Sequence, residues 1–88
     1  MHLPGQIRLF VLEALDRCAD EPMPESSLIA SVQLVHRHAH VGLDDCRAIL
    51  RTMEADALVS TSRDAVTEQT LYVLTPKGQA AYRARLSR

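Results

Sequence analysis

The chain has 88 residues, enough for one small domain over residues 1–88 and too few for two. Apolar residues make up 47% and charged residues 24%, a globular composition that excludes wholesale disorder. With no Trp, one Phe and two Tyr, the chain offers few rings on which single-stranded nucleic acids could stack. The net charge of −1 disfavours a strongly basic nucleic-acid coat.

Charge is distributed unevenly along the chain. Residues 1–35 contain two arginines and five acidic residues, whereas no acidic residue follows Glu68. The basic residues of this last part are Lys77, Arg83, Arg85 and Arg88. The sequence therefore predicts a polarised molecule with a basic carboxyl end.

Neither a membrane span nor a disulfide framework is expected. The longest apolar runs, residues 9–12 and 71–74, have four residues each, against the roughly 20 that span a bilayer. Polar and helix-breaking residues interrupt the amino-terminal segment, so we expect no signal peptide and a cytoplasmic location. Cys18 and Cys46 show no metal-ligand spacing, and we expect buried free thiols.

Helical periodicity dominates the first half of the chain. We expect a helix over about 3–19. Leu9 and Leu12 make its apolar stripe wider than one core needs, so we expect the helix to be covered on two sides, with a second subunit covering one of them. A second helix is expected over about 24–40, with Pro24 in its first turn. Its predicted buried face is Leu28, Ile29, Val32, Val35 and Ala39.

The second half changes period. We expect a helix over about 44–56 with Asp44 as N-cap, then a β-hairpin over about 58–74 with a loop of about five residues. Thr75 is the expected N-cap of a last helix over about 75–87. The fold class is mainly α with a small hairpin (α+β), in the order helix, helix, helix, strand, strand, helix.

Two passages resemble a known family. Residues 53–59 (Met-Glu-Ala-Asp-Ala-Leu-Val) resemble the Leu-Glu-x-x-Gly-Leu-Ile/Val passage that ends the recognition helix of many winged-helix regulators. Residues 72–78 (Tyr-Val-Leu-Thr-Pro-Lys-Gly) resemble the Tyr-x-Leu-Thr-x-x-Gly exit from their wing, one hairpin further on. The chain thus resembles the winged helix-turn-helix DNA-binding family. Ala57 departs from the pattern, which has Gly there to end the helix in a left-handed conformation.

The longer pattern is similar to small winged-helix proteins of Mu-like phages and prophages. The matching features are Ile7-Arg8-Leu9 with Val11-Leu12, Glu25-Ser26-Ser27-Leu28-Ile29, and a long second helix before Gly42. The resemblance implies a DNA-binding transcriptional regulator of a bacterium or phage, with double-stranded DNA as partner.

The resemblance and the helical spacing together give candidate DNA contacts. On the third helix, base contacts are expected from Arg47, Ala48, Arg51 and Thr52. Phosphate contacts are expected from Ser62 and Arg63 in the hairpin and from Arg37 and Lys77 beside it. The alternative is a solvated helix face in which the arginines pair with Asp44, Asp45 or Glu54.

A homodimer is expected, with Leu9, Leu12 and Leu86 at its interface. The alternative function is a winged-helix module that binds a protein partner through the apolar surplus of the first helix, without DNA. We expect no enzyme, because no nucleophile, phosphate-loop or metal motif occurs, and no cofactor. His36, His38 and His40 do not share one helix face, so no metal site is expected.

Overall fold

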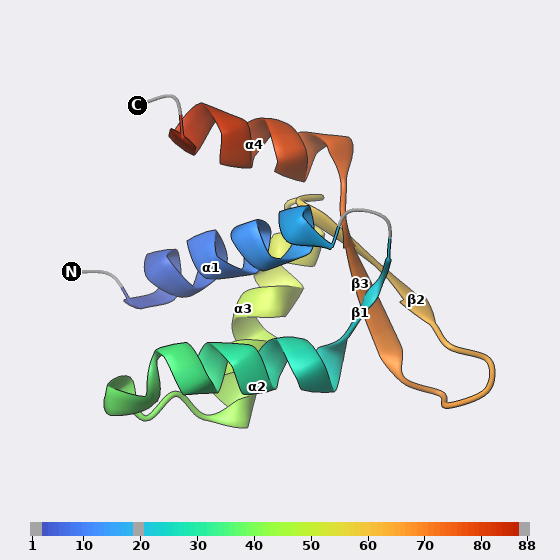
Figure 1. Ribbon diagram of the computed structural model, residues 1–88, viewed down its shortest axis with the longest axis horizontal. Helices are drawn as coiled ribbons and strands as arrows, with labels where there is room; N and C mark the ends of the chain where they lie inside the picture. Colours follow the sequence, from blue (N-terminus) through green and yellow to red (C-terminus); the bar gives the residue numbers. More distant parts are fainter. Residues whose placement is uncertain (1–2, 19–20, 87–88) are drawn as a thin grey trace.

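The computed structural model describes residues 3–18 and 21–86, except for the side chain of His38 (Figure 1). Within this part the fold is α+β, as predicted, with four α-helices and a three-stranded antiparallel sheet of order β1-β3-β2. The elements in chain order are α1 (Leu3–Arg17), β1 (Met23–Pro24), α2 (Glu25–Val35), the 3-10 helix η1 (Arg37–Ala39), α3 (Leu43–Ala55), β2 (Val59–Arg63), β3 (Thr70–Leu74) and α4 (Pro76–Leu86).

The predicted hairpin is confirmed, and a third strand joins it. β2 and β3 pair from Val59 opposite Leu74 to Arg63 opposite Thr70, and the hairpin projects from the helices in Figure 1. The predicted element order omitted β1, whose Met23 lies opposite Tyr72. The prolines around Met23 indicated only a helix break, but a two-residue edge strand tolerates proline because one side needs no donors. The order is therefore corrected to include a strand between α1 and α2.

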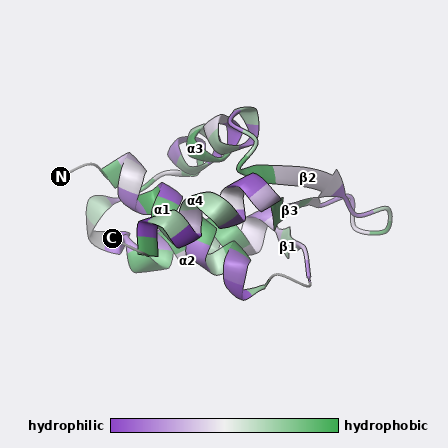
Figure 2. Cartoon of the chain, turned by 90° about the horizontal axis from the view of Figure 1, so that it is seen from above, coloured by the Kyte–Doolittle hydropathy of each residue, from purple (hydrophilic) through white to green (hydrophobic). Residues whose placement is uncertain are grey.

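The core lies between α1, α2 and α3 and is closed by the sheet. The buried hydrophobic residues of the described chain are Ile7, Val11, Leu12, Leu15, Leu28, Ile29, Val32, Val41, Cys46, Leu50, Met53, Val59 and Tyr72. Hydrophobic and hydrophilic residues alternate around the helices in Figure 2, as the sequence periodicity predicts. The packing of these apolar faces fixes which side of each helix remains exposed.

The surplus apolar width of α1 is covered by the same chain. Leu12 is only 8% exposed and belongs to the core, while Leu9 is half-buried. The helix α4 lies beside α1 in Figure 1, so it provides the second cover that was predicted to come from another subunit. Packing of α4 on α1 accounts for the burial of Leu12 without a partner.

The second helix ends earlier than predicted. α2 stops at Val35, which is 51% exposed, and the chain then forms η1 and the left-handed residue His40 (φ 53°). The predicted buried positions Val35 and Ala39 are both exposed. Ending the helix lets Val41 reach the core, where it is 8% exposed and its carbonyl oxygen accepts a 3.1 Å hydrogen bond from Gln33.

One predicted helix cap is wrong and the other is confirmed. α3 begins at Leu43 with Gly42 as N-cap, and the Asp45 carboxylate accepts the Gly42 N–H at 3.3 Å, so Asp44 does not cap this helix. A carboxylate three residues after the cap can reach back to it, whereas Asp44 lies one residue too early. Thr75 caps α4 as predicted, since its hydroxyl oxygen accepts the Gly78 N–H at 3.0 Å.

The junction between α3, β2 and α4 depends on two unusual positions. Ala57 adopts the left-handed conformation (φ 61°) that the resembling family gives to Gly. Gly78 packs so tightly that a Cβ atom there would lie 2.1 Å from the carbonyl oxygen of Leu58. The start of α4 therefore rests directly on the backbone that leaves α3.

The two cysteines are free but differ in exposure. Cys46 is buried, as predicted, and burial together with the nearby Asp45 raises the pKa of its thiol. Cys18 is exposed at the end of α1, so the prediction of a buried thiol is wrong there. Among the described residues, no helix combines the length and apolarity needed to cross a bilayer.

The predicted helix ends are otherwise off by a residue or two. α1 ends at Arg17, and the predicted limit, residue 19, lies outside the described residues. α3 spans Leu43–Ala55 where 44–56 was predicted. α4 starts one residue after the predicted position 75, and the predicted end at residue 87 also lies outside the described residues.

Candidate nucleic-acid interface

The outward face of α3 is set by what the helix buries. Cys46, Leu50 and Met53 point into the core, so Ala48 and Ala55 lie near the middle of the opposite face. Two edges flank this middle. The hairpin-facing edge consists of Arg47, Arg51 and Glu54, and the α1-facing edge consists of Asp45, Thr52 and Asp56.

A shared carboxylate organises the hairpin-facing edge. Arg47 donates from Nε to Glu25 Oε1 at 3.1 Å, and the hydroxyl of Tyr72 donates to Glu25 Oε2 at 3.1 Å. Glu54 accepts a 2.8 Å hydrogen bond from the hydroxyl of Thr61. Burial, and then the charge of Glu25, raises the pKa of Tyr72 to about 12. This edge thus joins α2, α3 and both long strands.

The α1-facing edge is more acidic. Arg8 on α1 forms a 2.9 Å ion pair with Asp56, and Asp45 accepts the Gly42 N–H described above. The hydroxyl of Thr52 donates to the carbonyl oxygen of Ile49 at 2.7 Å, within its own helix. A shallow hollow between the two helices is lined by Pro4, Arg8, Ala48, Ile49, Thr52 and Asp56.

The structure brings the four predicted base-contacting residues of α3 together on one exposed face, but on different parts of it. Arg47 and Arg51 lie on the hairpin-facing edge, Ala48 in the middle and Thr52 towards α1. The pairing of Arg47 with Glu25 could not be predicted, because 22 residues separate them and no motif links them. The predicted alternative partners, Asp44, Asp45 and Glu54, all belong to the third helix.

The hairpin loop is held by its own hydrogen bonds. One Asp64 carboxylate oxygen accepts from the N–H groups of Val66 (2.8 Å) and Thr67 (3.1 Å), and these bonds lower the pKa of Asp64. Arg63 donates from Nε to the carbonyl oxygen of Glu68 at 3.1 Å. Ser62 and Arg63 are exposed on β2, and Val66 at the tip is 91% exposed.

The remaining two predicted DNA contacts lie apart from each other. Arg37 is exposed in η1, at the end of α2 that points away from the hairpin in Figure 1. Lys77 is exposed in the first turn of α4, close to the junction at which α3 passes into β2. The structure therefore does not gather Arg37 and Lys77 into one patch.

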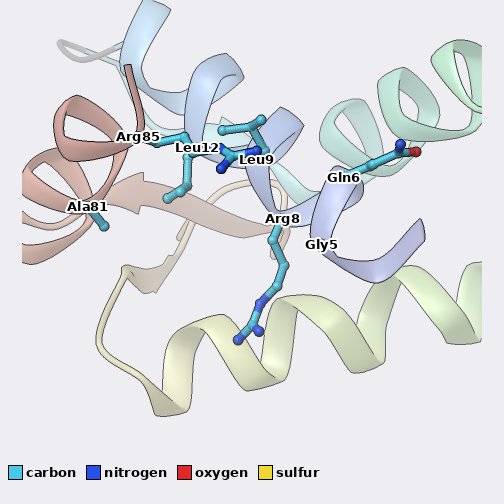
Figure 3. A pocket seen from close by; sticks show the side chains of 7 residues that line it. All are labelled: Gly5, Gln6, Arg8, Leu9, Leu12, Ala81 and Arg85. Atoms are coloured by element: carbon cyan, nitrogen blue, oxygen red, sulfur yellow. The ribbon is translucent and has the colours of Figure 1, made fainter. Parts of the chain in front are cut away.

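Two of the three predicted dimer residues meet in a groove between α1 and α4 (Figure 3). The groove is lined by Gly5, Gln6, Arg8, Leu9, Leu12, Ala81 and Arg85. Leu86 is 63% exposed but is not one of the lining residues. In Figure 3 the side chain of Arg8 points away from Leu9 and Leu12 towards α3, in keeping with its ion pair to Asp56.

The histidines of the α2–α3 connection are arranged by packing. His36 is half-buried and its ring meets Phe10 edge-on, with centroids 6.1 Å apart. His40 is exposed, and the side chain of His38 lies outside the described residues. In the part of the chain that the structure describes, no three His, Cys, Asp or Glu side chains gather in a way that could hold a metal ion.

Comparison of the chain with protein-family models, with curated proteins and with solved structures finds no match.

Proposed function

We propose that this chain is a winged-helix DNA-binding protein, a bacterial or phage transcriptional regulator that acts as a homodimer in the cytoplasm. The observation that carries the proposal is the position of α3. It follows α2 in a helix-turn-helix order, leaves an exposed face with two arginines, and leads directly into the β2–β3 hairpin that would serve as the wing.

In this proposal α3 enters the major groove with its hairpin-facing edge turned towards the bases. Arg47 and Arg51 donate to guanine O6 and N7, while Ala48 and the methyl group of Thr52 contact thymine methyl groups. The wing contributes Ser62 and Arg63 to the phosphate backbone. Arg37 and Lys77 add phosphate contacts where the duplex passes them.

The proposed homodimer uses the groove between α1 and α4, in which half-buried Leu9 provides accessible apolar surface, while Leu12 lines the groove with only 8% of its surface exposed. Leu86 extends that surface along α4. A two-fold arrangement presents two copies of α3, which suits a palindromic site with half-sites one helical turn apart.

Fluorescence anisotropy of a random 30-base-pair duplex, titrated with protein at several salt concentrations, tests the proposal. Even a specific regulator holds random DNA at low salt, and its affinity falls as counterions are released. The proposed contact cations without an ion pair in the described structure are Arg37, Arg51, Arg63 and Lys77. On random DNA, Arg51 can meet a phosphate instead of a guanine, so at most four phosphate contacts per protomer give a log–log slope no steeper than about −4 per protomer. Absence of binding at low salt contradicts the proposal.

A second function, binding of a protein partner without DNA, is favoured by one observation. Four carboxylates lie on or beside α3, against two arginines. The α1–α4 groove would then hold the partner. This alternative predicts no salt-dependent DNA binding, and it is contradicted when random DNA binds at low salt.

A further inference from the structure

The carboxylate of Glu25 connects three separate elements on the surface proposed to meet DNA. Glu25 is the first residue of α2, Arg47 lies in the first half of α3, and Tyr72 is the middle residue of β3. Each carboxylate oxygen accepts one hydrogen bond of 3.1 Å, Oε1 from Arg47 and Oε2 from Tyr72. The Glu25 side chain is 22% exposed, so solvent competes little for it.

The bond to Glu25 fixes Arg47 through the nitrogen that base recognition does not need. Nε donates to Glu25, whereas Nη1 and Nη2 have no partner among the described residues. A two-donor contact to guanine O6 and N7 can be made by these terminal nitrogens. Arg47 is 46% exposed, so its terminal nitrogens remain accessible.

We infer that Glu25 is a positioning residue that directs the guanidinium of Arg47 towards the bases, and that Tyr72 holds Glu25 in place. This inference rests on the proposed DNA-binding function. An arginine ordered before binding loses less conformational freedom when it meets a base. The negative charge of Glu25 meanwhile weakens attraction to phosphates at every sequence. Only the first effect raises specific over non-specific binding, because the charge acts equally on both.

Glu54 provides a matched control on the same edge. It is also a carboxylate of the hairpin-facing edge, but it accepts from Thr61 and does not contact Arg47. Glu54→Gln removes the same charge as Glu25→Gln and leaves the hydrogen bond from Arg47 to Glu25 in place. We therefore expect Glu54→Gln to strengthen binding to all duplexes by a similar factor.

The experiment starts with selection of a preferred site by the wild-type protein from a random duplex library. Affinity for this site and for random DNA is then measured for both variants. We expect Glu25→Gln to lower the affinity for the selected site about fivefold and to raise the affinity for random DNA about twofold. The ratio of the two affinities, the specificity, would then fall about tenfold. Tyr72→Phe should lower the specificity about threefold, which is half of the effect of Glu25→Gln on a logarithmic scale. In this variant Glu25 keeps its charge but loses the hydrogen bond from the Tyr72 hydroxyl.

Equal changes of Glu25→Gln on both duplexes, as for Glu54→Gln, would overturn the positioning role while leaving the DNA-binding proposal intact. Failure of the wild-type protein to bind any duplex would instead overturn the proposed function. Should Glu25→Gln unfold, Arg47→Lys replaces it, because lysine keeps the charge but lacks the Nε–H and the planar fork. Arg47→Lys should lose specificity as Glu25→Gln does, and unchanged specificity would contradict the inference.

Discussion

The two edges of the outward face of α3 differ in how their charges are arranged. On the hairpin-facing edge two arginines, Arg47 and Arg51, balance the carboxylates of Glu25 and Glu54, and the Arg47 guanidinium is oriented by the Glu25 carboxylate from another helix. On the α1-facing edge two aspartates predominate, and the nearest cation, Arg8, belongs to α1 and is paired with Asp56. The net charge of −1 of the whole chain therefore hides a difference in charge between the two edges. A polyanion would be attracted more strongly to the hairpin-facing edge than to the α1-facing edge.

The largest effect is expected at the junction of α3, β2 and α4, next to the end of the hairpin-facing edge. Gly78→Ala would place a Cβ atom 2.1 Å from the carbonyl oxygen of Leu58, so the start of α4 must move. We expect a loss of about 3 kcal/mol in the free energy of unfolding, measured by chemical denaturation. Gly42→Ala is the control, because its Cβ meets only an Asp45 oxygen at an ordinary 3.4 Å. Equal losses for the two variants would show that the junction is looser than described.

Removing the two arginines tests the hairpin-facing edge itself. Arg47→Ala with Arg51→Ala should weaken binding to a selected duplex by about 100-fold, because two base contacts of about 1–3 kcal/mol each are lost. The control variant, Arg8→Ala with Arg17→Ala, removes the same charge from α1 and should lower the affinity for that duplex by less than about fivefold. Anisotropy titrations at one salt concentration compare the pairs. A similar loss for both would mean that only total charge matters.

The contribution of the buried Tyr72 hydroxyl to stability should depend on pH. The folded protein keeps the Tyr72 proton up to about pH 12, whereas the unfolded chain releases it near pH 10. Burial is the largest cause of this difference and the charge of Glu25 the second. The stability gained by keeping Tyr72 buried and protonated is therefore complete below pH 10 and is lost as pH rises to 12, by roughly 2–3 kcal/mol. Denaturation midpoints at intervals from pH 9 to 12 would measure this. Tyr72→Phe should abolish that part of the pH dependence, and an identical slope in the variant would contradict it.

The smallest effect is a gain. Ala57 has a left-handed backbone that costs an alanine roughly 1 kcal/mol relative to glycine. Ala57→Gly should raise the free energy of unfolding by about 0.5–1 kcal/mol at the end of α3, without changing DNA affinity. A thermal melt shifted upward by a few degrees would agree, and a downward shift would mean that the turn does not hold this conformation.

Much of the fold could be predicted because local patterns coincide with packing. The apolar rhythm located α1 and α3 and most of the core, and Thr75 as N-cap located the start of α4. The strand β1 could not be predicted, because two residues carry no period and Met23 joins the sheet only through Tyr72. The early end of α2 reflects the tertiary burial of Val41.

The candidate site was predicted in part for the same reason. Helical spacing placed Arg47 and Arg51 on the exposed face of α3, because that depends only on which side is apolar. It could not reveal Glu25 as the partner of Arg47, since that contact arises only when the start of α2 packs beside α3 and β3. The burial of Leu12 likewise depends on α4.

The central claim is that DNA meets the hairpin-facing edge of α3. Its most direct test is a two-dimensional nitrogen-15 NMR titration of the labelled protein with a 30-base-pair duplex at low salt, following backbone amides and arginine Nε–H groups. The claim predicts the largest shifts at the side chains of Arg47 and Arg51 and the amides of Ser62 and Arg63. Shifts centred on Leu9, Leu12 and Ala81, or no shifts at all, would contradict it.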